Sequence, residues 1–171
     1  TGWPLLDSHY SPAPGYVTIV TGVPSHGKST WLDALLVQIA QLDEQQRFAV
    51  FSPESYPVSR HTLRLASRVA GLPWYGPDRM PDETAQHALS WVSQHFWFLD
   101  PDIGLTIDAV LEAAEKLLRR HGITGLIVDP WNELEHARPK EMTETEYVSV
   151  VLGRIRRWAR AHKVHIWLVA H

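Results

Sequence analysis

Cysteine is absent from the 171-residue chain, so neither a disulfide framework nor a cysteine-ligated zinc site can hold the fold together. An excess of positive charge is also missing, because 16 Lys and Arg face 19 Asp and Glu and leave a formal net charge of −3. The surface as a whole therefore does not attract nucleic acid, and any such contact must be local. No apolar run approaches the roughly 18 residues of a membrane-spanning helix, so we expect no membrane partner. The length suits one domain with a substantial core, in a reducing compartment.

Short apolar runs alternate with amphipathic stretches along the chain. The runs are rich in β-branched and aromatic residues and predict strands buried on both faces, at 16–22, 48–54, 96–100, 125–130 and 165–171. Apolar residues at three-and-four spacing predict helices between them, at 31–42, 58–70, 82–94, 107–118 and 148–159. This alternation is typical of a parallel sheet flanked by helices. We therefore predict a single α/β domain over 1–171, with a mainly parallel sheet, helices on both faces and a turn-rich lead-in at 1–15.

Two of the predicted helices carry capping residues at their starts. Thr106 stands immediately before one amphipathic stretch, where a side-chain oxygen can accept a hydrogen bond from the first turn. Thr143 and Glu146 have the spacing of a capping box ahead of another. The Pro-rich segment 71–81 is predicted to be a loop that joins two helices.

The segment TGVPSHGKST, residues 21–30, satisfies the P-loop pattern G-x-x-x-x-G-K-[ST], with a predicted strand before it and a helix after it. Its glycines let the backbone curl so that successive N–H groups converge on phosphate oxygens, and the helix N-terminus adds its dipole. Lys28 would reach the β- and γ-phosphates, and the Ser29 hydroxyl would ligate Mg²⁺. We therefore predict that a nucleoside triphosphate is bound by Gly22, Val23, Pro24, Ser25, His26, Gly27, Lys28, Ser29 and Thr30.

Polar residues close three other predicted strands. Asp129 ends GLIVDP at the strand edge where parallel sheets bind ligands, and it would hold the water shell of Mg²⁺ or act only as a turn residue. Glu54 ends FAVFSPE and could polarise the water that attacks the γ-phosphate, or simply complement the dipole of the next helix. His171 ends HIWLVAH and could sense the γ-phosphate, although a lone His at a chain end more often has no such role.

These four pieces, in this order, resemble the RecA-like ATPase core of hexameric replicative helicases of the DnaB, Twinkle and phage primase-helicase types. TGVPSHGKSTWLDALLVQIA is similar to their first motif, and FSPESYPVSRHTLRLASRVAG is similar to their second. GLIVDPWNEL resembles their Walker B strand, and IRRWARAHKVHIWLVAH resembles the stretch leading to their sensor strand, which ends in His in the Twinkle and phage branch. The resemblance covers essentially the whole chain and implies a RecA-like P-loop NTPase fold.

The resemblance also implies a role for each residue and a set of partners. Lys28 and Ser29 bind phosphate and Mg²⁺, Glu54 and Lys28 are catalytic, Asp129 is the Walker B acid that holds Mg²⁺ through water, and His171 is the γ-phosphate sensor. The implied cofactor is Mg²⁺ with ATP. The implied partners of the full-length protein are single-stranded DNA and further copies of itself in a ring, expected to be a hexamer. The expected location is the cytoplasm, of a bacterium or of a phage-infected host.

Parts of the family pattern lie beyond these residues. The family's arginine finger and second DNA-binding loop follow its sensor strand, and its strand order runs 3-2-4-5-1 with further strands beside the first. We therefore expect a fragment of a longer protein, truncated after the fifth core strand, in which strand 16–22 is a sheet edge covered by residues 1–12 or by a neighbouring molecule. Lacking the arginine finger, the fragment is expected to bind nucleotide and hydrolyse it weakly.

Three functions fit these features. The first is the ATP-hydrolysing motor domain of a replicative DNA helicase or primase-helicase. The second is a recombinase-type or clock-type ATPase of the RecA class, which shares the P-loop, the second-motif carboxylate and the Walker B acid. The third is a nucleotide-gated interaction module that binds ATP without turning it over.

Arginine residues gather on several predicted helices. Arg60, Arg64 and Arg68 form a stripe at i, i+4 and i+8, which indicates either a solvated face or a contact with another subunit or with phosphate. The loop 130–144 stands where the family's first DNA-facing loop would be. It mixes basic residues with several acids, so a strong grip on phosphate from this loop alone is not expected.

Overall fold

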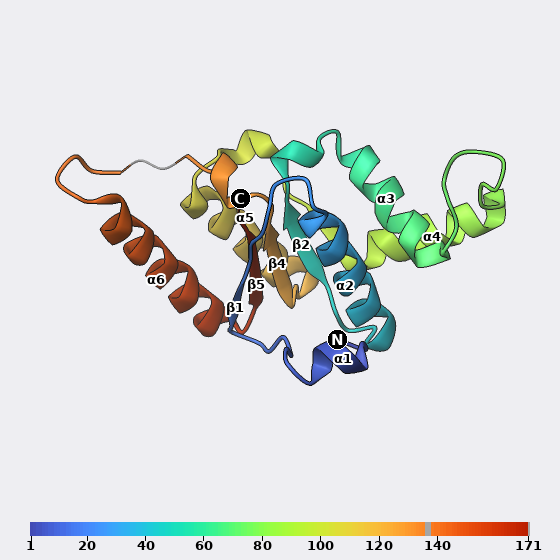
Figure 1. The fold of residues 1–171 in the computed structure, drawn as a ribbon, viewed down its shortest axis with the longest axis horizontal. Helices are drawn as coiled ribbons and strands as arrows, with labels where there is room; N and C mark the ends of the chain where they lie inside the picture. The colour runs from blue at the N-terminus through green and yellow to red at the C-terminus, as the bar shows by residue number, and fades with distance from the viewer. Residues whose placement is uncertain (136–137, 171) are drawn as a thin grey trace.

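A five-stranded parallel sheet forms the centre of the computed structural model, which describes residues 1–135 and 138–170. Its strand order is β1-β5-β4-β2-β3 (Figure 1), which is the expected order 3-2-4-5-1 read from the other edge. The predicted fold class is therefore confirmed, and β1 is an edge strand among the described residues. The strands are β1 Val17–Val20, β2 Phe48–Phe51, β3 Phe96–Phe98, β4 Gly125–Val128 and β5 His165–Val169.

Helices cover both faces of the sheet. One face packs against α2, α3 and α4, and the other packs against α5 and α6 (Figure 1). The helices are α1 Pro4–Asp7, α2 Lys28–Leu42, α3 Val58–Ala70, α4 Asp82–His95, α5 Ile107–His121 and α6 Glu144–His162, with 3-10 turns at Pro53–Ser55, Pro101–Ile103 and Trp131–Glu133. Among the described residues, no helix combines the length and the apolar character needed to span a bilayer.

The predicted helix caps are formed. The Thr106 hydroxyl accepts a hydrogen bond from the Ala109 N–H at 3.3 Å, and α5 begins at the next residue. Thr143 and Glu146 form a reciprocal capping box, which explains why α6 begins at Glu144, ahead of its apolar period.

The central strands alternate their side chains between the two cores, as the pleat of a strand requires. In β2, Ala49 and Phe51 pack in the core beneath α5 and α6, whereas Phe48 and Val50 pack in the core beneath α2 to α4. The prediction of double-sided burial does not extend to β1, an edge strand, where Ile19 is 53% exposed. Residues 1–12 do reach this strand at Thr18, whose hydroxyl lies 3.0 Å from the Tyr10 hydroxyl.

Gly125 opens β4 in a place where two aromatic rings meet. A Cβ at this position would lie 2.7 Å from Phe48 Cδ1 and 2.7 Å from Trp167 Cζ3. Both side chains are buried, and their rings are in edge contact with centroids 6.0 Å apart. Because Gly125 has no side chain, the rings of Phe48 and Trp167 from the neighbouring strands occupy the space that a Cβ would need.

His165, the first residue of β5, ties the lead-in segment to the sheet. Its Nδ1 lies 2.8 Å from the Ala13 carbonyl oxygen, and its Nε2 lies 2.9 Å from the Thr18 hydroxyl. The indole N–H of Trp167 donates to the Tyr10 hydroxyl at 2.9 Å. Burial lowers the pKa of His165, and the contact with the Ala13 backbone opposes this only in part. The lead-in is therefore packed into the domain, in contact with the buried imidazole.

We expect His165 to make the domain less stable below neutral pH. Because the pKa of His165 is lower in the folded chain than in the unfolded chain, the unfolded chain binds the proton first. The stability is fully present above about pH 6.5, the ordinary histidine pKa, and falls as the pH drops from there toward the folded pKa. The measurement is the unfolding midpoint of wild type and of His165→Gln at pH 8 and pH 5. The difference between them should shrink at pH 5, and an equal difference at both pH values would contradict this role.

Candidate nucleotide-binding site

The loop between β1 and α2 has the backbone of an anion cradle. Gly27 adopts φ +82°, a left-handed conformation that favours glycine, and it is the N-cap of α2. No described side chain caps this helix, so its first N–H groups require partners from outside it. The helix dipole favours an anion at the same point. The residues of 21–27 are exposed, so the loop is open to solvent.

Lys28 begins α2 with its side chain folded over the loop. Its ammonium group donates to the carbonyl oxygens of Gly22 at 2.9 Å and of Val23 at 3.2 Å. The positive charge is therefore held at the mouth of the loop, next to the backbone that would receive a phosphate. This is the placement that a phosphate-binding lysine requires.

Asp129 lies buried at the carboxyl end of β4, with 5% of its surface exposed. Its N–H donates to the Phe51 carbonyl at 2.9 Å, which anchors it to the end of β2. The Ser29 side chain, in the first turn of α2, is close enough to interact with this carboxylate. Burial raises the pKa of Asp129, and the interaction with Ser29 opposes this only in part. The predicted Walker B acid and the predicted P-loop serine therefore meet.

Glu54 lies at the end of the neighbouring strand. It occupies the 3-10 turn Pro53–Ser55, three residues beyond the end of β2, and its side chain is exposed. Strands β2 and β4 are parallel partners with Phe51 opposite Val128, so Glu54 and Asp129 emerge at the same edge of the sheet. The predicted sensor His171 lies outside the described residues, two positions in the sequence after Val169, the last residue of β5.

A protein-family model described as "AAA domain" matches residues 12–171, which is nearly the whole chain. The chain belongs to the AAA domain family. It is also 39% identical over 179 residues to the "Twinkle homolog protein, chloroplastic/mitochondrial" of Arabidopsis thaliana, an alignment that covers 100% of this chain and 25% of the relative. The chain thus spans a quarter of that protein.

This AAA domain also shares its fold with a solved replicative helicase. The structure described as "The Structure Of A DnaB-Like Replicative Helicase And Its Interactions With Primase" superposes with a TM-score of 0.74 at 15% identity. The match covers 99% of this chain and 43% of that one. With the family match and the Twinkle homolog, it confirms the predicted resemblance to the RecA-like core of replicative helicases.

The AAA domain also contains a buried polar cluster that the sequence did not reveal. Asp33 and His61 are 5% and 3% exposed, and the His61 Nε2 lies 2.9 Å from the Asp33 Oδ1. Arg64 donates from Nε to the other carboxylate oxygen of Asp33 at 2.8 Å. The one available signal was the spacing of Asp33, which follows Ser29 by four residues and therefore lies on the same side of the helix.

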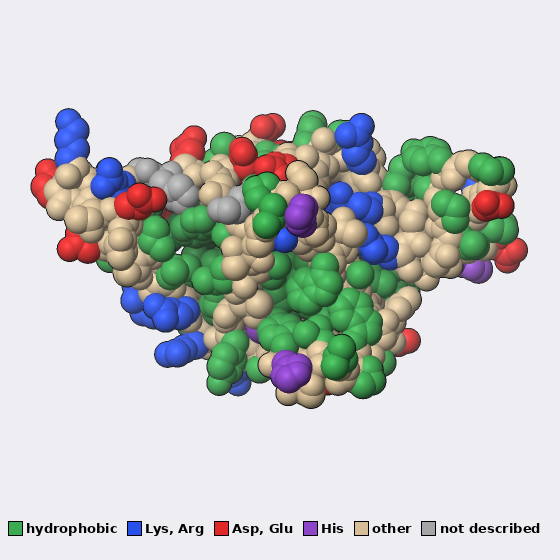
Figure 2. Space-filling model, viewed as in Figure 1, with side chains coloured by type: hydrophobic (Ala, Val, Ile, Leu, Met, Phe, Trp, Pro, Cys, Tyr) green, Lys and Arg blue, Asp and Glu red, His purple; other side chains and the backbone are tan. Residues whose placement is uncertain are grey.

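The arginine side chains of the predicted stripe on α3 of the AAA domain lie in different environments. Basic side chains gather along this helix (Figure 2), and Arg60 there is exposed, whereas Arg64 is paired with a buried carboxylate. On α6, Arg154 forms an exposed pair with Asp108 of α5. Exposed pairs of this kind contribute little to stability. The solvated-face interpretation therefore fails for Arg64.

The loop predicted to face DNA is described only in part, at 130–135 and 138–144. It contains the short turn Trp131–Glu133, and Arg138 donates to the Met142 carbonyl at 3.0 Å. That bond uses one N–H of the guanidinium on the loop's own backbone. The AAA domain therefore provides no concentrated basic surface in the described part of this loop.

Proposed function

We propose that this chain is the ATP-binding and ATP-hydrolysing motor domain of a replicative DNA helicase or primase-helicase. The observation that carries the proposal is that the Ser29 side chain, in the helix after the P-loop, interacts with the buried carboxylate of Asp129 and lowers its pKa. This interaction links α2, which follows the phosphate-binding loop, to the carboxyl end of β4. In the sheet, β4 lies two strands from β1, the strand that precedes the loop. The similarity to the Twinkle homolog over the full length of the chain supports the assignment.

The residues fit a magnesium ion. Mg²⁺ prefers oxygen ligands and keeps several waters, and the site offers a serine hydroxyl and a carboxylate, both oxygen donors. The hydroxyl of Ser52, at the end of β2, is a further buried oxygen with no hydrogen-bond partner among the described residues. Ser29 would ligate the ion and Asp129 would hold its water shell. The ion supplies positive charge to the β- and γ-phosphate oxygens.

The remaining residues bind, orient and move protons. The N–H groups of the loop and the ammonium group of Lys28 would hold the phosphate oxygens. Glu54 would accept a proton from the water that attacks the γ-phosphate. His171 would contact the γ-phosphate from the end of β5. In the sequence, each of these groups comes after the end of a strand of the sheet. Open parallel sheets bind ligands beyond the carboxyl ends of their strands.

The partners follow from the same proposal. We propose that the full-length protein binds single-stranded DNA and assembles into a ring, expected to be a hexamer, with ATP between subunits. The cytoplasmic location stays a prediction, since the plant relative is named as chloroplastic/mitochondrial.

A strand-separation assay tests the proposal. The full-length protein is expected to unwind a forked DNA duplex in the presence of ATP and Mg²⁺, and to lose this activity when EDTA removes the metal. Strand exchange without unwinding would instead favour a recombinase. Nucleotide binding without phosphate release would favour an ATP-gated switch. Either result would overturn the motor assignment.

A further inference from the structure

Asp33 joins two helices through both oxygens of one carboxylate. It lies on α2, one helical turn after Ser29, and both partners come from α3: His61 bonds Oδ1 and Arg64 bonds Oδ2. The two distances are 2.9 Å and 2.8 Å. A carboxylate held from both sides has little freedom to rotate, so the relative position of the two helices is fixed at this point.

A buried charge cluster is a poor source of stability. Removing charges from water is costly, and well-packed apolar residues often serve stability equally well. What a cluster of this kind supplies is a defined geometry, because its hydrogen bonds form only in one arrangement of the helices. The cluster therefore acts through the groups that it positions.

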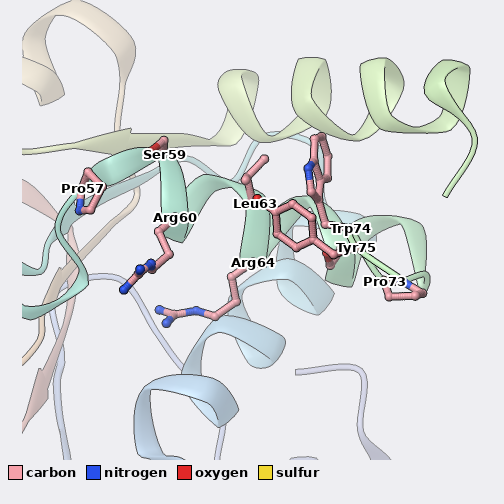
Figure 3. A pocket seen from close by; sticks show the side chains of 9 residues that line it. Pro57, Ser59, Arg60, Leu63, Arg64, Pro73, Trp74 and Tyr75 are labelled. Atoms are coloured by element: carbon pink, nitrogen blue, oxygen red, sulfur yellow. The ribbon is translucent and has the colours of Figure 1, made fainter. Parts of the chain in front are cut away.

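Arg64 extends the link toward Glu54. Its Nε bonds Asp33, and its Nη2 lies 3.5 Å from the hydroxyl of Ser55, the residue after Glu54 in the same 3-10 turn. Figure 3 shows the Arg64 side chain leaving α3 on the side of α2. One planar guanidinium thus contacts the helix that carries Ser29 and the turn that carries Glu54.

We infer that Arg64 is a positioning residue for ATP hydrolysis, which holds the Glu54 turn at a fixed place relative to the P-loop helix through Asp33 and Ser55. The inference rests on the proposed catalytic role of Glu54. A carboxylate that orients a water must be held to within a fraction of an ångström, and misplacement by about 1 Å can cost 10²-fold in rate. Arg64 touches neither nucleotide nor metal in this account, so its loss affects the chemical step and spares nucleotide binding.

The test is Arg64→Lys in the full-length protein. Lysine keeps the charge and can reach Asp33, but its single ammonium cannot span Asp33 and Ser55 as a planar guanidinium does. We expect kcat for ATP hydrolysis to fall about tenfold while KM and the Kd of a fluorescent ATP analogue stay within about twofold. The matched control is Arg79→Lys, which changes an exposed Arg–Asp pair in the loop 71–81 and should leave all three values unchanged.

Ser55→Ala provides an independent readout. It removes the other end of the same contact, so kcat should fall in the same direction, and the double variant should be no slower than Arg64→Lys alone. Unchanged kcat in Arg64→Lys, or a fall in kcat matched by weaker nucleotide binding and a lower unfolding midpoint, would overturn the inference. A wild-type protein that does not hydrolyse ATP would overturn the proposed function itself, which separates the two failures.

Discussion

Replacing Glu54 with glutamine is expected to reduce kcat for ATP hydrolysis by the full-length protein about 10²–10⁴-fold. Glutamine has nearly the same shape but cannot accept the proton of the attacking water. Glu54 lies exposed in its 3-10 turn, so the change creates no buried unpaired group and should not unfold the domain. Nucleotide binding should persist, since it depends on the loop and on Lys28.

Phosphate release at saturating ATP and the Kd of a fluorescent ATP analogue measure these two effects separately. The matched control is Glu44→Gln, the same chemical change at an exposed position before β2, at the opposite end of that strand. It should leave both values within about twofold of wild type. If Glu54→Gln released phosphate at the wild-type rate, the hydrolytic carboxylate would lie elsewhere. If neither protein released phosphate, the switch interpretation would gain.

Gly125→Ala is expected to destabilise the domain by about 2 kcal/mol although it adds only one methyl group. The new Cβ would lie 2.7 Å from ring atoms of Phe48 and Trp167, closer than real Cβ contacts occur. Both rings are buried and pack on each other, so neither can move without disturbing its neighbours. For a domain of this size, about 2 kcal/mol corresponds to a drop of roughly 4–8 °C in the unfolding midpoint.

Calorimetry of the variant and of Gly153→Ala checks this expectation. Gly153 lies within α6, where a Cβ would meet only the end of the Arg157 side chain at 3.4 Å. Alanine is the better helix former, so Gly153→Ala should leave the midpoint unchanged or raise it by the equivalent of about 0.5–1 kcal/mol. The same substitution is thus expected to act in opposite directions at two glycines. Equal midpoints for both variants would mean that the rings around Gly125 repack without cost.

Local patterns predicted the elements and the phosphate loop of this domain well. The P-loop, the capping box at Thr143 and the order of the strands all follow from short-range sequence signals or from the family resemblance. Every strand is shorter than its predicted run, β2 ending at Phe51 rather than residue 54. The chain leaves the strand pairing before it reaches Glu54 and Asp129, and an apolar run does not reveal that point.

The contacts of Asp33 could not be predicted in the same way. Asp33 pairs with His61, which is 28 residues away in the sequence, and with Arg64 beyond it. An acid within an amphipathic helix usually lies on the solvated face. Only the packing of α2 against α3 buries it, and no single-helix pattern contains that packing. The role of Glu54 and that of His171 rest on the resemblance and stay predictions.

The hydrogen bond between Tyr10 and Trp167 has a consequence for where this domain begins. The family match starts at residue 12, two residues after the side chain that accepts the buried indole N–H. Trp3 lies further upstream, and the centroid of its ring is 6.4 Å from the ring centroid of Trp31 in α2. A truncation at the boundary of sequence similarity would therefore leave an interior donor unsatisfied and strip an aromatic partner from the nucleotide-binding helix. The folded unit therefore extends upstream of the sequence that the family model matches, and Trp3 and Tyr10 pack against its core.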